Sequence, residues 1–474
     1  MPLWLTLLLL VLLLALVVMV ILENGHPSRT LAWILTLVLL PPVGLLFFIF
    51  FGISRKRRRL VRGEEMDRIK ARVRDAVGDS LCTEPPSAQK NLVTLLERTG
   101  HALPVRGNDV RVYTDFNPMF EELLADLEQA RHHIHFQFFI FAKDETARRV
   151  ADVLARKAAE GVEVRVLVDG VVNCNRRAFY RRNMEKQGVQ LHVFRQGGIW
   201  DLIDANYRNH RKNVVIDGRI GYTGGMNIAN RYAEGLTKGG KHRVWRDTHM
   251  RVAGPVVAEM QAAFLLDWRF SARELLDKAE YFPRLAPAGN LLMQMAISEP
   301  MGAYRSILYG VEQMIASSRR YVYIQTPYFI PGDALFAAMR NAALSGVDVR
   351  MMIPQKADLN ILNIIQCAGQ SYFADLLAAG VKIYFYEKGF LHPKLVVADD
   401  EVATVGSTNL DIRSLEQDCE INAFFYDAPF AVQMRETFLQ EERDCTRITP
   451  EAWAARSGFR RFLESLTRLF SPVF

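Results

Sequence analysis

Two copies of one motif combine residue types that can act on a phosphate ester. Each copy reads H-x-K-x4-D, and an asparagine follows its histidine by 17 positions. The members are His210, Lys212, Asp217 and Asn227 in the first copy and His392, Lys394, Asp399 and Asn409 in the second. Histidine carries protons or attacks as a nucleophile near neutral pH, and lysine supplies a compact positive charge. Two identical half-sites predict one composite active site, with a histidine from each half.

The chemistry that this set fits best is phosphodiester transfer. Lys212 and Lys394 would stabilise the negative charge of the phosphate, while Asn227 and Asn409 would donate neutral hydrogen bonds. One histidine can attack phosphorus and form a covalent phosphohistidine. The other can protonate the leaving alcohol and then deprotonate the incoming alcohol. Because lysines take the role that metal ions often have, we expect neither a metal nor a cofactor.

Each catalytic imidazole needs a partner on its second ring nitrogen, which fixes its tautomer. The candidates are Asp247 in VWRDTH and Glu420 in DCEIN, each of which follows the asparagine of its own half. Asp217 and Asp399 belong to the catalytic motif. However, we expect them to brace a turn or a neighbouring cation, because of where they fall on the predicted strands.

Local structure follows from the motif sequences. The first motif is predicted to form a strand at NHRKNVVID, a tight turn at Asp217–Gly218 and a returning strand at RIGYTGG. Side chains alternate along a strand, so His210 and Lys212 share a face and the motif aspartate points elsewhere. The same pattern is expected around His392. The glycines and Ser407 that precede the two asparagines would let the backbone approach a ligand closely.

The region that carries the motifs repeats itself. Gly161 and Gly346 begin similar apolar strands and are 185 residues apart, whereas the motif histidines are 182 apart. In each half an apolar strand, a helical stretch and a second apolar strand indicate a βαβ unit. We predict an α/β fold with two similar lobes, residues 107–285 and 286–474, that share one active site. A basic and mostly helical connector, residues 55–106, precedes them.

The N-terminal residues predict a membrane anchor. Residues 1–22 and 31–53 contain no charged side chain, and five basic residues follow at 55–59. We therefore expect two transmembrane helices within residues 1–54, with the catalytic lobes on the cytoplasmic side. The basic run either holds anionic lipid headgroups or serves only as a topology signal. A cleaved signal peptide is disfavoured, since the first segment lacks a basic start and a small-residue cleavage site.

Composition narrows the choice of partners. The formal net charge is +7, which favours an anionic partner such as nucleic acid or an acidic membrane surface. The predicted anchor, and the lack of zinc-finger, RNP or basic-zipper patterns, argue against nucleic acid. Five cysteines without a CxxC pair are expected to be reduced thiols, not disulfides or zinc ligands.

Three other stretches each allow more than one structural interpretation. His132, His133 and His135 are interpreted as packed or rim side chains in preference to metal ligands. Residues 358–365 form either an apolar lip near the site or a segment packed on the sheet. The C-terminal tail places apolar side chains on one helical stripe beside several arginines, which fits either an interfacial helix or a core-packed helix. Its members are Phe459, Phe462, Leu463, Leu466 and Phe470, with Arg456, Arg460, Arg461 and Arg468.

The whole chain resembles the bacterial cardiolipin synthases of the phospholipase D superfamily. The resemblance rests on the two hydrophobic N-terminal segments, both motif copies, GGMNI, WRDTH, IQTPYF and GSTNLDIRSLEQDCEIN. It implies reversible transfer of a phosphatidyl group between two phosphatidylglycerol molecules, with His210 as nucleophile and His392 as acid and base. One departure is Gln137 in HFQFFIF, where relatives commonly carry an acidic residue.

The resemblance also implies a location and sets the rival functions. We expect a protein embedded in the bacterial cytoplasmic membrane that acts on anionic phospholipids and leaves nucleic acid unbound. The rivals are hydrolysis to phosphatidic acid, transfer with another phospholipid donor or alcohol acceptor, and a silent scaffold that binds anionic lipid. The sequence leaves the oligomeric state open.

Overall fold

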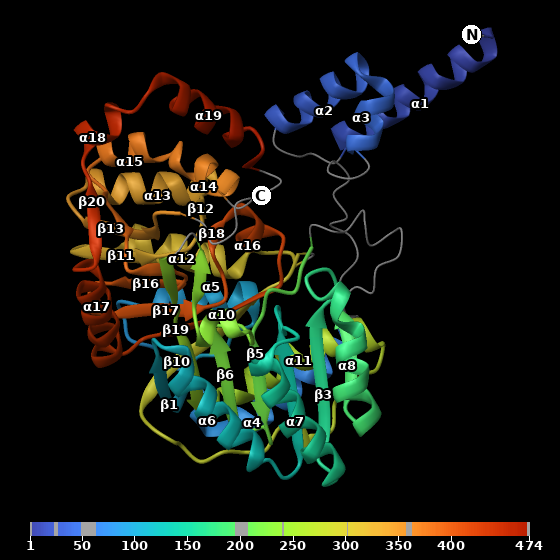
Figure 1. Ribbon diagram of the computed structural model, residues 1–474, viewed down its shortest axis with the longest axis vertical. Helices are drawn as coiled ribbons and strands as arrows, with labels where there is room; N and C mark the ends of the chain where they lie inside the picture. The colour runs from blue at the N-terminus through green and yellow to red at the C-terminus, as the bar shows by residue number, and fades with distance from the viewer. Residues whose placement is uncertain are drawn as a thin grey trace.

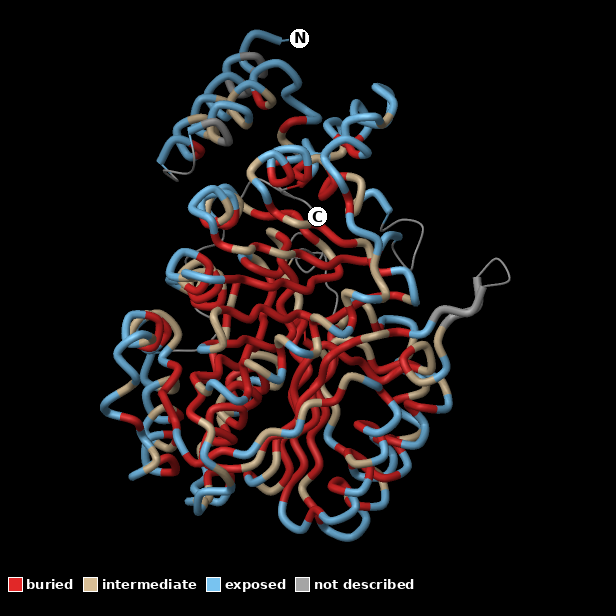
Figure 2. The backbone as a smooth tube through the Cα atoms, turned by 90° about the vertical axis from the view of Figure 1, so that its left-hand side faces the viewer, coloured by how far each residue is buried: buried red, intermediate tan, exposed pale blue. Residues whose placement is uncertain are grey.

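A 15-stranded mixed β-sheet forms the centre of the protein in the computed structural model (Figure 1). The structure describes residues 2–22, 27–48, 63–194, 207–238, 241–300, 302–356 and 363–471. Helices lie on both faces of the sheet, and buried backbone is concentrated along its strands (Figure 2). This arrangement is the α/β class that the alternation of strands and helices predicted.

The order of strands in the sheet shows the internal repeat. Starting at the centre, the first half runs β1 (Val105–Tyr113), β9 (His249–Ala253), β6 (Ile220–Gly224), β5 (Asn213–Ile216), β2 (His133–Phe138), β3 (Glu163–Asp169) and β4 (Gln190–Phe194). The second half runs outward in the matching order: β10 (Leu291–Ser298), β19 (Glu420–Phe425), β17 (Val402–Gly406), β16 (Leu395–Ala398), β11 (Tyr321–Gln325), β13 (Asp348–Pro354), β14 (Lys382–Tyr386) and β20 (Cys445–Ile448). Antiparallel pairing of β1 with β10 joins the two halves.

The predicted βαβ units are present in both halves. β2, β3 and β4 pair in parallel, and so do β11, β13 and β14. Each half also has three long helices at matching places in the chain. They are α6 (Phe116–Glu128), α7 (Glu145–Ala159) and α11 (Val257–Ala272) in the first half, and α12 (Ser306–Ser317), α13 (Asp333–Leu344) and α17 (Ala428–Glu442) in the second. The lobe boundaries at 107, 286 and 474 remain predictions.

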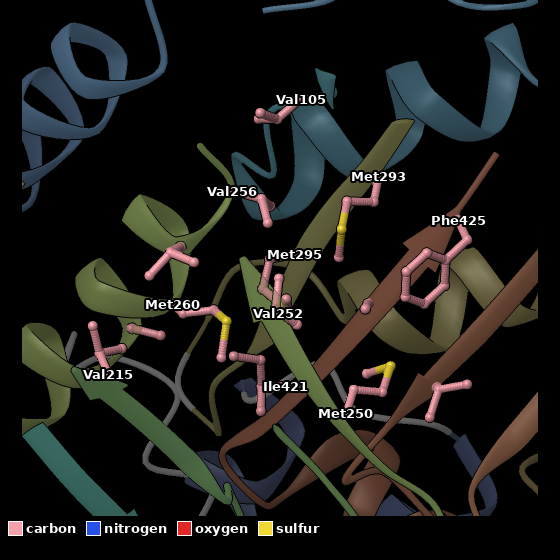
Figure 3. Packing of buried hydrophobic residues seen from close by; sticks show 14 of the residues in the cluster. Val105, Val215, Met250, Val252, Val256, Met260, Met293, Met295, Ile421 and Phe425 are labelled. Atoms are coloured by element: carbon pink, nitrogen blue, oxygen red, sulfur yellow. The ribbon is translucent and has the colours of Figure 1, made fainter. Parts of the chain in front are cut away.

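One hydrophobic core crosses the junction between the halves. Figure 3 shows Met250 and Val252 of β9 beside Met295 of β10 and Ile421 of β19, all fully buried or nearly so. Burial of a Met, Val or Ile side chain stabilises a fold by roughly 1.5–3 kcal/mol. The contacts at this junction therefore hold the two halves in a fixed relation, as a site shared between them requires.

Short cross-connections place the two motifs at the junction. β15 (Gly389–Leu391) pairs in parallel with β8 (Lys241–Arg246), which itself forms a hairpin with β7 (Leu236–Lys238). Asn209 forms a bridge with Cys419. Each motif histidine is thus one residue from a strand contact with the opposite half.

Three helices form the described N-terminal part of the chain. α1 (Leu3–Leu22) is followed by two shorter helices, α2 (Pro27–Leu39) and α3 (Pro41–Phe47). Pro41 and Pro42 lack the N–H group that would continue α2. Within the part of the chain that the structure describes, no helix is long and apolar enough to cross a membrane. The transmembrane hairpin within residues 1–54 is not confirmed, and the basic run at 55–59 lies outside the described residues.

The described part of the connector contains two α-helices. α4 (Gly63–Val77) packs on α11, and α5 (Lys90–Gly100) packs on β10 and α12. The remaining elements are the helices α8 (Arg177–Asn183), α10 (Asn230–Ala233), α14 (Asn363–Gln370), α15 (Phe373–Ala378), α16 (Ile412–Glu416), α18 (Pro450–Ala454) and α19 (Gly458–Arg468), with the strands β12 (Phe329–Ile330) and β18 (Leu410–Asp411). Residues 358–362 of the predicted apolar lip lie outside the described residues.

The histidine cluster on β2 is a packed structure. Gln261 joins His133 and His135 through contacts of 3.0 Å and 2.7 Å, and both rings are fully buried. Burial lowers the pKa of His133 to about 4. Among the described residues, no group of three or more His, Cys, Asp or Glu side chains is arranged to hold a metal ion.

Candidate active site

Each motif histidine is paired with a carboxylate from the opposite half. His210 Nδ1 lies 2.8 Å from Glu420 Oε1, and His392 Nδ1 lies 2.5 Å from Asp247 Oδ2. Backbone hydrogen bonds also join each motif histidine to the opposite half. The N–H of His210 donates to the carbonyl of Cys419 at 3.0 Å, and that of His392 donates to the carbonyl of Arg246 at 2.7 Å. Each half therefore supplies the carboxylate that pairs with the histidine of the other half.

The paired carboxylates determine the tautomer of both rings. An ionised carboxylate only accepts hydrogen bonds, so the proton of each neutral imidazole is on Nδ1 and the lone pair is on Nε2. Burial is the main cause that lowers the pKa of His210 to about 4 and that of His392 to about 3. The pKa values of Asp247 and Glu420 are also lowered: burial raises them, but the adjacent lysine and histidine outweigh it. Both Nε2 atoms are thus prepared to attack or to exchange protons.

The motif lysines lie against their histidines. Lys212 Nζ donates to the carbonyl of His210 at 2.6 Å, and Lys394 Nζ lies 2.8 Å from His392 Nδ1 and 3.2 Å from its Nε2. Burial lowers the pKa of Lys212 to about 7 and that of Lys394 to about 8. A phosphate that enters beside these groups would be attracted by two positive charges in a site with little water.

The four side chains behave as one electrostatic unit. Lys394 of the second half lowers the pKa of His210, and Lys212 of the first half lowers that of His392. The two histidines and two lysines are at most 8% exposed. Aromatic rings cover both imidazoles, with ring centroids 4.6 Å apart for Phe139 and His210 and 5.2 Å apart for Trp245 and His392. The arrangement can bind an anion and pass protons on opposite sides of it.

The two motif asparagines have different surroundings. Asn227 Oδ1 accepts from the N–H of Ile140 at 3.0 Å, and its Nδ2 donates to the hydroxyl of Tyr232 at 2.8 Å. Asn409 is 6% exposed, and its Oδ1 is buried with no hydrogen-bond partner among the described residues. Asn227 is therefore engaged in holding the loop after β2, whereas Asn409 retains bonding capacity next to the second motif.

Gly225 and Ser407 contact the partner carboxylates, which differs from the close approach to a ligand that the sequence predicted. A Cβ atom on Gly225 would lie 2.1 Å from Asp247 Oδ1, a distance that excludes any side chain. At the corresponding place, the Ser407 hydroxyl donates to Glu420 Oε2. These small residues let the carboxylates reach the histidines.

Asp217 and Asp399 do not reach the site, which corrects their assignment to the catalytic set. Asp217 accepts from the backbone N–H groups of residues 131, 132 and 133 at 2.7–2.9 Å. Asp399 accepts from those of residues 319, 320 and 321 at 2.7–2.9 Å. Both occupy a turn with positive φ, 53° and 57°. Each aspartate thus ties a motif hairpin to the start of a central strand, the bracing role that the strand pattern favoured.

Replacing Asp399 should therefore lower stability without removing activity. In Asp399→Ala three backbone donors lose a charged acceptor, for a loss of about 2–4 kcal/mol in the free energy of unfolding. Asp399→Asn keeps one acceptor oxygen and tolerates positive φ, so a loss of about 1 kcal/mol is expected. Urea denaturation measures the stability, and kcat of the folded fraction should change by no more than about threefold. A stable Asp399→Asn protein without activity would contradict the bracing role.

Two supporting arginines were not identified from the sequence. Arg211 Nη1 lies 2.6 Å from Asp267 Oδ1, and its Nε donates to the carbonyl of Glu420 at 3.1 Å. Arg246 forms an ion pair with Glu441 and donates to the carbonyl of Asp247. Arg211 stands inside the motif, which could have indicated it, but Asp267 carries no sequence signal.

Gln137 and its counterpart Gln325 extend both ion pairs. Gln137 Nε2 donates to Asp267 Oδ2 at 2.7 Å, and Gln325 Nε2 donates to Glu441 Oε2 at 2.6 Å. Gln137 also donates to Asn209 Oδ1 at 2.9 Å. The glutamine is therefore a neutral donor to a buried carboxylate, a role that an ionised acid could not take.

The motif histidines and lysines lie before the strands on which the sequence placed them. β5 begins at Asn213 and β16 at Leu395, directly after Lys212 and Lys394. The preceding residues pair across the junction with the opposite half, so they are positioned by tertiary contacts. The strand–turn–strand hairpins that follow are present as predicted.

Anion binding should weaken as pH rises. Lys212 and Lys394, with pKa values of about 7 and 8, lose their charge as pH passes through this range. A bound anion stabilises the protonated lysines, so affinity is highest below about pH 7. Dimethyl phosphate is suitable, because it remains a monoanion. Calorimetry should show its Kd rising about tenfold or more between pH 6 and pH 9. A constant Kd would contradict the lowered lysine pKa values.

Comparison with known proteins gives consistent matches over the chain. Residues 123–237 and 311–441 match the family described as cardiolipin synthase, phospholipase D-like domain, and residues 8–52 match the phospholipase D-nuclease N-terminal family. A cardiolipin synthase of Oceanobacillus iheyensis is 36% identical over 96% of this chain and 95% of its own. The major cardiolipin synthase ClsA of Bacillus subtilis is 36% identical over 95% of each chain.

A solved structure supports the fold. The phosphatidylserine synthase of Haemophilus influenzae superposes with a TM-score of 0.62 and 12% sequence identity, covering 81% of this chain and 97% of that one. At this level of identity the likeness concerns the arrangement of helices and strands. That arrangement is the mixed α/β fold described above.

Proposed function

The chain belongs to the cardiolipin synthase family of phospholipase D-like enzymes, and from this premise we propose how its active site makes cardiolipin. It is a phosphatidyltransferase that joins two phosphatidylglycerol molecules and releases glycerol. One phosphodiester replaces another, so the reaction is reversible and consumes no nucleotide.

In the first step, His210 Nε2 attacks the phosphorus of one phosphatidylglycerol. The P–N bond forms while the bond from phosphorus to the glycerol oxygen breaks, and protonated His392 gives its Nε2 proton to that oxygen. The bound phosphodiester anion favours the protonated form of His392, which is neutral in the empty site. Lys212 and Lys394 stabilise the charge on the non-bridging oxygens.

In the second step, a headgroup hydroxyl of another phosphatidylglycerol enters where glycerol left. His392 Nε2 takes the hydroxyl proton, the alcohol oxygen attacks phosphorus, and the P–N bond breaks. Cardiolipin leaves and His210 is regenerated. The choice of His210 as nucleophile follows the family resemblance, since the two histidines have closely similar surroundings.

The observation that carries this proposal is that each motif histidine is paired with a carboxylate from the opposite half. Glu420 holds His210 and Asp247 holds His392, so that both Nε2 atoms carry lone pairs in one buried site. A mechanism that needs one nucleophile and one acid–base group requires two such imidazoles. Aspartates 217 and 399 support the hairpins and take no part in bond making.

Burial of the site favours transfer over hydrolysis. Water competes with the second lipid for the phosphohistidine, so synthesis requires that water be excluded. The four motif side chains are at most 8% exposed, and aromatic rings cover both histidines. These observations support a synthase over the hydrolase that the same histidines could serve.

We propose that residues 1–54 hold the enzyme at the bacterial cytoplasmic membrane, with lobes 107–285 and 286–474 on the cytoplasmic side. The uncharged sequence of residues 1–22 and 31–53 supports anchoring, and so does the family match over residues 8–52. Many leucines of α1 are exposed, including Leu3, Leu10 and Leu14. An apolar surface of this kind is stable in lipid and costly in water.

Product analysis tests the proposed function. Purified protein in phosphatidylglycerol vesicles, with EDTA present, should form cardiolipin and free glycerol in equal amounts. His210→Ala should lose both products, and His101→Ala, which changes an exposed histidine, should retain them. Phosphatidic acid without cardiolipin would show that water is the acceptor. Absence of turnover with every phospholipid would leave the lipid-binding scaffold.

A further inference from the structure

The C-terminal helix α19 faces the solvent with its apolar side. Six large apolar side chains between positions 459 and 470 are exposed: Phe459 71%, Phe462 61%, Leu463 37%, Leu466 42%, Leu469 74% and Phe470 54%. They recur at the three- and four-residue spacing of one helical face. A helix that packs on a protein core directs such residues inward, so the core-packed alternative for this tail is wrong.

The polar side of α19 holds the helix on the protein. Glu464 is 2% exposed and forms ion pairs with Arg456 and Arg460. Arg460 also donates to Gln370 of α14 at 3.1 Å, and the Arg468 guanidinium lies 4.1 Å from the ring centroid of Tyr372. These contacts fix the rotation of the helix, which means that the outward apolar face is built into the fold.

The charge of the segment points to the kind of surface that covers this face. Residues 456–470 contain four arginines and one glutamate, and Arg460, Arg461 and Arg468 are exposed beside the apolar side chains. Exposed phenylalanines and leucines next to arginines are typical of helices that lie in the boundary layer of an anionic bilayer. Arg460 is already paired with Glu464, but a purely apolar protein partner would supply no counter-charge to Arg461 and Arg468.

The position of α19 agrees with a membrane on this side. Figure 1 shows α19 at the end of the molecule where α1, α2 and α3 lie, and Figure 2, turned about the same vertical axis, keeps the N-terminal helices at that end. The helices predicted to anchor the chain and the outward face of α19 therefore lie at one end of the molecule.

A short series of contacts connects α19 with the active site. α19 packs on α14, and α14 packs on β12 so closely that a Cβ atom on Gly369 would lie 2.4 Å from the carbonyl oxygen of Phe329. Phe329 pairs with Leu410 of β18, the residue after Asn409. A surface that contacts α19 thus lies over the part of the second half that carries Asn409.

We propose that the outward face of α19, residues 459–470, docks on the anionic bilayer and holds the active site near the headgroups that it uses. The inference rests on the proposed function in its choice of an anionic lipid surface. It adds a second membrane contact, within the catalytic region, to the one proposed for residues 1–54. Phenylalanine and leucine side chains enter the boundary layer, and the arginines contact headgroup phosphates.

Photo-crosslinking tests the proposal on the full chain. p-Benzoylphenylalanine replaces Phe462, or Leu344 at the end of α13, which is a matched control with 66% exposure. The protein is placed in vesicles of phosphatidylglycerol and phosphatidylcholine and irradiated, and adducts are identified by mass spectrometry. Lipid adducts at position 462 should exceed those at position 344 by about tenfold or more. A crosslink from position 462 to another protein chain, or equal lipid labelling at both positions, would overturn the proposal.

Kinetics give a second readout that separates docking from catalysis. The variant Phe459→Ser/Phe462→Ser/Leu466→Ser changes only exposed side chains, so its fold should persist. Its kcat/KM should fall about tenfold on phosphatidylglycerol in vesicles and stay unchanged on a soluble, short-chain phosphatidylglycerol. Leu344→Ser should change neither value. Equal activity of the triple variant and the native chain on vesicles would overturn the proposal.

The crosslinking result does not depend on catalytic turnover. Crosslinking is repeated with His210→Ala, in which catalysis is expected to be lost while α19 is unchanged. Lipid adducts at position 462 without cardiolipin formation by the native chain would reject the proposed function and keep the docking face. Cardiolipin formation without these adducts would support the proposed function and reject the docking face.

Discussion

His210→Ala is expected to abolish phosphatidyl transfer with every substrate, whereas His392→Ala should still react once with a substrate that needs no proton. In a p-nitrophenyl phosphodiester the leaving group departs as an anion, so the acid is dispensable and the nucleophile is not. Loss of the nucleophile should lower kcat by about 10⁴-fold or more. Loss of the acid–base group should lower it by about 10²–10⁴-fold with phosphatidylglycerol.

The difference between the variants is measured in the first turnover. His392→Ala should release about one equivalent of p-nitrophenolate per active site and then stop, because no base remains to activate the acceptor. His210→Ala should show no burst, and His101→Ala should behave like the native chain. A burst in His210→Ala would reverse the assignment of the two histidines.

Glu420→Gln and Asp247→Asn should each lower kcat by about 10²–10⁴-fold. Either change removes the charge that stabilises a protonated imidazole and fixes its tautomer, as in other histidine–carboxylate pairs. The distances of 2.8 Å from His210 to Glu420 and 2.5 Å from His392 to Asp247 predict equal importance for the two carboxylates. Glu416→Gln, an exposed glutamate four residues from Glu420, is the matched control.

Double variants test which carboxylate serves which histidine. Asp247→Asn should add little to the loss caused by His392→Ala, because the partner of the carboxylate is already absent. Glu420→Gln should add its full effect in that background. The opposite pattern would mean that each carboxylate serves the histidine of its own half, which contradicts the exchange seen in the structure.

Sequence patterns predicted the parts of the fold that depend on local order. Alternation of apolar strands and helices located the βαβ units, and the Asp-Gly turn, with the same pattern expected in the second motif, located the two hairpins. The duplicated H-x-K-x4-D spacing indicated one composite site. These features arise within a few tens of residues, so they are visible in a single chain.

The arrangement of the site depends on contacts between distant segments, which spacing does not reveal. Both carboxylates were found as candidates, yet their exchange between halves follows from the pairing of β15 with β8 and of Asn209 with Cys419. The same contacts place His210 before β5 instead of on it. Asp267 supports Arg211 from 56 positions away in the chain. Only the folded sheet brings these groups together.

The outward direction of α19 was also open in the sequence. An amphipathic pattern shows that a helix has an apolar face but not which way that face points. The buried Glu464 and its two arginines decide it, because Arg460 also donates to Gln370 and so anchors the polar face on α14.

The central claim is that His210 becomes covalently linked to the phosphatidyl group within a site built by both halves. The most direct test is mass spectrometry of His392→Ala protein that has reacted with the p-nitrophenyl phosphodiester and been quenched in alkali, where phosphohistidine survives. The adduct is expected on the peptide that contains His210, and it should be lost in His210→Ala/His392→Ala. An adduct on any other residue, or release of p-nitrophenolate without an adduct, would contradict this claim.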